Sequence, residues 1–120
     1  MSLRETLNSI VQSVDGALAA LFMAYDGIPI DEVTVEFSEF DMQLLSVEYA
    51  NVLKEIKRAV NVIKMGDLEE VTITTSRTCI LVSILNDDIF SALIMRLDGN
   101  IGKGRYMLKL KSFEILQELS

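Results

Sequence analysis

The sequence lacks histidine altogether, and it contains a single cysteine and a single proline among 120 residues. Because imidazole is the usual general base near neutral pH and the commonest metal ligand, its absence excludes Ser-His and Cys-His nucleophile pairs and the usual metal centres. The lone cysteine, Cys79, cannot form an internal disulfide, and the apolar residues 80–82 that follow it predict a buried, unreactive thiol. We therefore expect no metal, no cofactor and no catalytic residue.

Long hydrophobic runs are also missing. The longest nearly all-apolar run, Gly16 to Tyr25, is far shorter than the roughly 18 apolar residues that a membrane helix needs. Near the start of the chain, Arg4, Glu5 and Asn8 occupy positions where a signal peptide would have its apolar region. The sequence predicts a cytoplasmic protein that does not insert into a membrane.

Basic residues are scarce in the first half of the chain. Residues 1–53 hold nine acidic residues and one basic residue, whereas residues 54–120 hold nine acidic and ten basic residues, for a net charge of −7. Such a chain repels phosphate backbones, so nucleic-acid binding is not expected. Half of the residues are apolar, which leaves apolar surface for a partner and favours an oligomer.

Hydrophobic periodicity predicts eight elements in a single domain covering residues 1–120. Apolar residues at helical spacing predict an amphipathic first helix and two later ones, and alternating or continuous apolar runs predict strands. The predicted helices span about residues 3–14, 41–65 and 102–119, and the predicted strands span residues 17–25, 30–37, 70–75, 78–85 and 89–97.

The long second helix should lie flat on a sheet. Ser38 to Asp41 supply candidate N-caps. Leu44 and Val62 fall outside the apolar stripe, on the same side as Asn51 and Glu55, where a second helix could cover them. The predicted core-facing stripe, about 120° wide, consists of Met42, Leu45, Tyr49, Val52, Leu53, Ile56, Ala59, Val60 and Ile63.

The apolar patterns of the strands predict their order. Strands one, four and five are apolar on both faces and belong in the middle, whereas strands two and three alternate and belong at the edges. With the hairpin links one-two and three-four-five, the order 2-1-5-4-3 satisfies this pattern. We expect an α/β (α+β) fold with an antiparallel five-stranded sheet, the long helix on one face and the terminal helices on the other.

The segment Tyr25 to Asp31, with the sequence YDGIPID, is predicted to be a turn. Asp26-Gly27 between two strands favours a type I′ hairpin, and Pro29, which lacks an N–H, fits an edge strand. A catalytic role for Asp26 is the weaker alternative.

Two other segments could carry chemistry, but simpler interpretations are favoured. Residues 98–105, DGNIGKGR, resemble a phosphate loop but lack the Gly-x-x-x-x-Gly-Lys-Ser/Thr spacing, so a strand-to-helix joint is favoured. The acid pairs at residues 69–70 and 87–88 fall at turns or strand starts, where water solvates them.

The order of these motifs resembles the roadblock/dynein light chain family along essentially the whole chain. The stretch GALAALFMAYDGIPID is similar to bacterial members with an Asp-Gly-(Leu/Ile)-Pro turn, and NIGKGR is similar to the family's Asn-(Leu/Ile)-Gly-x-x-Arg joint. The resemblance implies a homodimer in which the third strands pair and the long helices lie side by side. A heterodimer with a second roadblock-like chain is the alternative. We place the dimer interface at Leu44, Asn51, Glu55, Val62, Glu70, Val71, Thr72, Ile73 and Thr74.

The resemblance also implies a Ras-like small GTPase as partner, bound by the paired helices, with Glu48, Lys54 and Arg58 as contact residues. In such a complex the chain would stimulate GTP hydrolysis by arranging the GTPase's own residues. A scaffold that binds without changing hydrolysis is the second hypothesis. A stand-alone enzyme or small-molecule sensor is the third.

Overall fold

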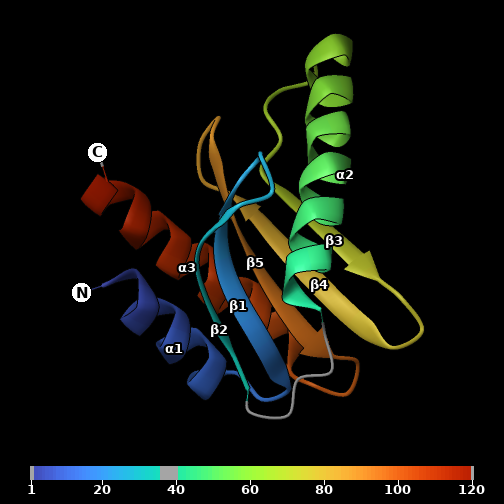
Figure 1. Cartoon of the computed structure of the whole chain (residues 1–120). Helices are drawn as coiled ribbons and strands as arrows, with labels where there is room; N and C mark the ends of the chain where they lie inside the picture. The colour runs from blue at the N-terminus through green and yellow to red at the C-terminus, as the bar shows by residue number, and fades with distance from the viewer. Residues whose placement is uncertain (1, 36–40, 120) are drawn as a thin grey trace.

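The computed structural model describes residues 2–35 and 41–119 and contains the eight predicted elements in the predicted order (Figure 1). The helices are α1 (Leu3–Ser13), α2 (Met42–Ile63) and α3 (Ile101–Leu119). The strands are β1 (Ala17–Ala24), β2 (Pro29–Thr34), β3 (Glu70–Thr74), β4 (Thr78–Ile84) and β5 (Ile89–Arg96).

The strands form one antiparallel sheet in the order β2-β1-β5-β4-β3, as predicted. The three central strands are nearly fully buried because their residues are apolar on both faces, whereas the edge strands alternate or lie half exposed. Cys79 lies inside the sheet on β4 and is buried, as predicted.

Helices cover both faces of the sheet, with α2 on one face and α1 and α3 on the other (Figure 1). Under α1 and α3, the side chains of Leu7, Ile10 and Leu93 are fully buried. Under α2, Leu53 and Ile94 are fully buried. Burying each such side chain stabilises the fold by roughly 1.5–3 kcal/mol, so the two apolar clusters together hold the layers in place.

The predicted packing of α2 is partly wrong. Its buried residues are Ser46, Ala50 and Leu53, so the sheet-facing side is rotated relative to the predicted stripe. Val52 and Ile63, expected in the core, are 43% and 60% exposed. The apolar stripe is wider than the surface that the sheet offers it, and the C-terminal turns of α2 extend past the end of the strands (Figure 1).

The turn between β1 and β2 is not of type I′. The Ala24 carbonyl accepts from the Gly27 N–H at 3.2 Å, and the Ala24 N–H donates to the Ile28 carbonyl at 3.4 Å. Gly27 has a φ of +87°, and Lys64 is the non-glycine residue with positive φ in the described chain. Asp26 therefore does not have the positive φ that type I′ requires, and the pattern is that of a type I turn followed by a left-handed glycine.

The region between β2 and α2 differs from expectation in its boundaries. The structure begins β2 at Pro29 and ends it at Thr34, where the sequence predicted residues 30–37. The predicted strand residue Phe37 and the N-cap candidates 38–40 lie outside the described residues. The fourth N-cap candidate, Asp41, does cap α2, because its carboxylate accepts from the Leu44 N–H at 3.0 Å.

The segment that resembled a phosphate loop is a tightly packed joint. A Cβ on Gly99 would lie 2.6 Å from the Asp15 carbonyl oxygen. Only glycine therefore fits where the connection between β5 and α3 crosses the connection between α1 and β1. The Asn100 side chain accepts from the Lys103 N–H at 3.1 Å and caps α3. The N–H groups of Asn100, Ile101, Lys103 and Gly104 are thus bonded within the protein, which supports the strand-to-helix joint.

Candidate functional site

Strand β3 forms one edge of the sheet, and its residues alternate between the two faces. Val71 and Ile73 are half buried and pack against the apolar cluster beneath α2, while Glu70, Thr72 and Thr74 are exposed. On the opposite face, Arg105 of α3 donates to the Thr72 hydroxyl at 3.3 Å. Its terminal position in the sheet gives β3 a row of outward N–H and C=O groups that another strand could pair with.

Helix α2 exposes an unusual amount of apolar surface. A 3.6-residue turn puts side chains nine residues apart on opposite sides of a helix. Leu44 and Val62, each nine residues from the buried Leu53, therefore point directly away from the sheet. The exposed large apolar residues of α2 are Leu44, Val47, Val52, Val62 and Ile63.

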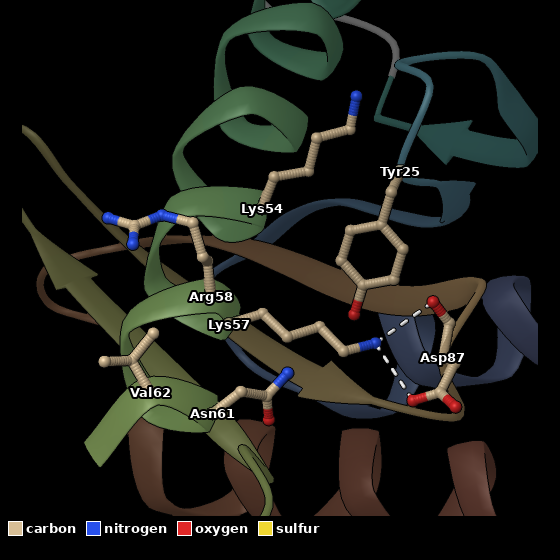
Figure 2. A pocket seen from close by; sticks show the side chains of 7 residues that line it. All are labelled: Tyr25, Lys54, Lys57, Arg58, Asn61, Val62 and Asp87. Carbon is tan, nitrogen blue, oxygen red and sulfur yellow. Dashed lines mark hydrogen bonds and ion pairs between the residues drawn. The ribbon is translucent and has the colours of Figure 1, made fainter.

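Two of the remaining exposed apolar residues of α2, Val52 and Ile63, lie on the β3 side, whereas Val47 lies beside Gly27 of the β1–β2 turn. Asn61 and Lys54 line a cavity against β1 and the loop between β4 and β5 (Figure 2). Val52 is nine residues from Asn61, and Ile63 is nine residues from Lys54, so both occupy the opposite side of the helix. That side looks along the sheet toward the β3 edge. The side of α2 that carries Val52, Ala59 and Ile63, together with the β3 edge, is here called the β3-side surface.

The structure brings the predicted interface residues to the outside of the molecule. The outer surface of α2 exposes Leu44, Asn51, Glu55 and Val62. The strand residues Glu70–Thr74 form the edge of the sheet. Sequence reasoning did not expect Val52, Ala59 and Ile63 at the surface, because it assigned them to the core. The available signal was the number of apolar residues in the α2 stripe, which exceeded what one sheet could cover.

The predicted GTPase contacts Glu48, Lys54 and Arg58 are also exposed on α2. The Arg58 Nε donates to the Glu55 carboxylate at 3.2 Å, and both side chains remain more than half exposed. Such a surface ion pair contributes about 0–1 kcal/mol. A binding partner could therefore break it at little cost.

A cavity of about 480 Å³ lies between α2 and the ends of β1, β4 and β5. It is lined by Lys54, Lys57, Arg58, Asn61 and Val62 from α2 and by Tyr25 and Asp87 from the sheet side (Figure 2). No sequence motif predicted this cavity, because its residues come from three separate parts of the chain.

Lys57 is the central cation of this cavity. Its ammonium lies 3.0 Å from the Asp87 carbonyl oxygen and 3.2 Å from the Asp87 carboxylate, and 4.8 Å from the centre of the Tyr25 ring. The Tyr25 ring also packs against Phe90, with 5.2 Å between ring centres. Burial, reinforced by the negative charges of Asp87 and Asp88, raises the pKa of the Tyr25 hydroxyl.

Among residues 2–35 and 41–119, no three His, Cys, Asp or Glu side chains gather where they could hold a metal ion. Within the same ranges, none of the helices combines the length and the apolar character that crossing a membrane requires. What the surface of α2 and β3 offers is contact area, both apolar and charged.

The fold has solved counterparts in bacteria. MglC from Myxococcus xanthus is 36% identical, with a TM-score of 0.71, and the match covers 98% of this chain and 99% of that one. A roadblock/LC7 domain from Streptomyces avermitilis is 15% identical, with a TM-score of 0.83 and coverage of 99% and 98%. The gliding protein MglB from Thermus thermophilus is 15% identical, with a TM-score of 0.84 and coverage of 95% and 85%.

These matches differ in kind. The two at 15% identity show a shared fold, whereas the match to MglC extends to the sequence along nearly the whole length of both chains. No protein-family model matches the chain, and no curated protein sequence does.

Proposed function

Because this chain belongs to the roadblock/LC7 family, we propose that it acts as a homodimer that binds and regulates a Ras-like small GTPase. The observation that carries this proposal is the β3-side surface. There, exposed Val52 and Ile63 lie beside an edge strand whose inner residues are already apolar.

A two-fold axis suits this surface well. In a two-fold dimer the same patch serves both subunits, so two β3 strands pair antiparallel and extend the sheet across the subunits. The α2 helices then lie side by side on the same face of the enlarged sheet. Val52, Ala59 and Ile63 form the centre of the helix contact in this proposal, with Leu44, Asn51, Glu55 and Val62 at its outer margin.

The paired α2 helices are the proposed binding surface for the GTPase. Glu48, Lys54 and Arg58 are exposed there, and a dimer presents two copies of each. The chain supplies no catalytic residue in this proposal, and it stimulates GTP hydrolysis by arranging the GTPase's own residues.

An adaptor function is the second candidate. The chain is 36% identical to MglC but 15% identical to the gliding protein MglB, so its sequence is much more similar to that of MglC than to that of MglB. In an adaptor, the same dimer and the same helices would bind the GTPase or a second roadblock-like chain without changing hydrolysis.

Single-turnover GTP hydrolysis separates the two candidates. The substrate is GTP bound to a Ras-like GTPase from the same genome, and hydrolysis is followed with and without an excess of this protein. A tenfold acceleration, about 1.4 kcal/mol off the barrier, supports the regulator that stimulates hydrolysis. Binding with an unchanged rate supports the adaptor. The absence of binding in both nucleotide states would refute the GTPase partner.

A further inference from the structure

The cavity between α2 and the ends of β1, β4 and β5 lies on the side of α2 opposite Val52 and Ile63. The proposed dimer contact therefore leaves it open. Its volume of about 480 Å³ falls within the range of roughly 300–1,000 Å³ that is usual for ligand sites. Lys54 and Arg58 line the cavity and are also proposed GTPase contacts, so an inference about this cavity is tested on the protein without a GTPase.

Hydrogen-bond donors from separate parts of the chain line this cavity. Lys57 extends across it toward Asp87, whereas the Lys54 ammonium points away from Lys57, toward the backbone end of Tyr25 (Figure 2). In the part of the chain that the structure describes, the Lys54 side chain makes no ion pair or hydrogen bond. Asn61 contributes an amide from the next turn of the helix. Arg58 also lines the cavity, but its guanidinium points away from Tyr25 (Figure 2).

The Tyr25 hydroxyl is a buried hydrogen-bond donor that has no acceptor among the described residues. Its oxygen is buried and has no hydrogen-bond partner within the described residues, and Figure 2 shows it directed toward the Lys57 ammonium. Leaving such a group unpaired is unfavourable, because burial removes its hydrogen bonds to water. Because its pKa is raised, the hydroxyl keeps its proton and remains able to donate at physiological pH.

The Asp87 carboxylate shows which chemistry the cavity accommodates. It lies 3.2 Å from the Lys57 ammonium although the Asp87 side chain is 98% exposed. A carboxylate on so exposed a side chain can rotate into solvent, while Lys57 keeps its bond to the Asp87 carbonyl oxygen. An incoming anion could then occupy the same place at the ammonium.

We propose that this cavity binds an oxyanion, the phosphate or carboxylate group of a ligand. The oxyanion displaces the Asp87 carboxylate from Lys57 and accepts hydrogen bonds from the Tyr25 hydroxyl and the Asn61 amide. The Lys57 ammonium supplies the positive charge, and lysine is a common point-charge partner of phosphate. The Tyr25 ring provides an apolar wall for the organic part of the ligand. Its source is either a phosphorylated small molecule or an acidic side chain of a bound protein.

The test is a titration of the whole protein with inorganic phosphate, and separately with acetate, followed by ¹H–¹⁵N NMR at constant ionic strength. Saturable shifts of the Asn61 side-chain amide are expected. Tighter binding of phosphate than of acetate points to the phosphorylated small molecule. Equal or tighter binding of acetate points to the carboxylate of a protein. Shifts that fail to saturate with both anions, or that sodium chloride reproduces, would overturn the proposal.

Four variants make the test specific. Lys57→Gln should weaken binding about tenfold or more, and Asp87→Asn should strengthen it by removing the competing carboxylate. Tyr25→Phe keeps the ring beneath Lys57 but removes the donor, so it should weaken binding while leaving the thermal stability unchanged or higher. Lys103→Gln removes one exposed charge on α3 and serves as the control. Equal losses of affinity in Lys57→Gln and Lys103→Gln would show that only the overall charge matters, which would overturn the proposal. Unchanged affinity in Tyr25→Phe would also overturn it, because the hydroxyl would then not contact the anion.

Discussion

Replacing Val52 by aspartate should separate the proposed dimer into folded subunits. Val52 is 43% exposed in the single chain, so burial in the dimer recovers close to half of the roughly 1.5–3 kcal/mol for a fully buried side chain. A two-fold dimer contains two copies of Val52, so their burial contributes about 1–3 kcal/mol to dimer stability in total. Burying a carboxylate without a partner costs several kcal/mol more. A combined loss of roughly 4 kcal/mol weakens the dimer about a thousandfold.

The matched control for Val52→Asp is Asn61→Asp, which adds the same charge nine residues later, on the opposite side of α2. Light scattering after size exclusion at micromolar concentration should give a monomer for Val52→Asp and a dimer for Asn61→Asp. Circular dichroism should show unchanged helix and sheet content in both, because each site is exposed in the subunit. A dimeric Val52→Asp would refute the placement of the helix contact on the β3 side, and so would dissociation of both variants.

Three further predictions test the edge strand, the partner surface and the Tyr25 environment. Val71→Asp or Ile73→Asp should also break the dimer, and a dimer with unchanged sheet content in either would contradict pairing through β3. Arg58→Ala should weaken GTPase binding in a titration while the dimer persists, and unchanged affinity would remove Arg58 from the contact. Because the pKa of Tyr25 is raised above its ordinary value of 10.0, the folded state holds this proton longer than the unfolded state. Stability should therefore fall as pH rises above about 10. Urea unfolding of Tyr25→Phe should lack that part of the loss, and identical pH profiles would contradict it.

The strand order could be predicted from the sequence because burial leaves a direct record in residue type. Leu81 and Val82 of β4 are adjacent, so they face opposite sides of the sheet, and both are buried. A strand with two buried faces must lie inside the sheet. In β3, Val71 and Ile73 alternate with threonine and glutamate, which fits one covered face and an edge position.

The rotation of α2 could not be predicted in the same way. A valine such as Val52 has the same apolar side chain whether it packs against its own sheet or against a second subunit. The prediction of the turn type was wrong for a similar reason, because Asp26-Gly27 suits a type I turn followed by a left-handed glycine as well as it suits type I′. The cavity between α2 and the ends of β1, β4 and β5 could not be predicted, because Tyr25, Lys57 and Asp87 become neighbours only through the fold.

The dipole of α2 also bears on how two helices would pair. A two-fold axis perpendicular to the sheet requires the two α2 helices to run antiparallel, which places the first half of one beside the second half of the other. The N-terminal end of one helix then lies beside the C-terminal end of the other, so opposite ends of the two helix dipoles come close to one another. Pairing through β3 is thus also the arrangement that the dipoles of the α2 helices favour.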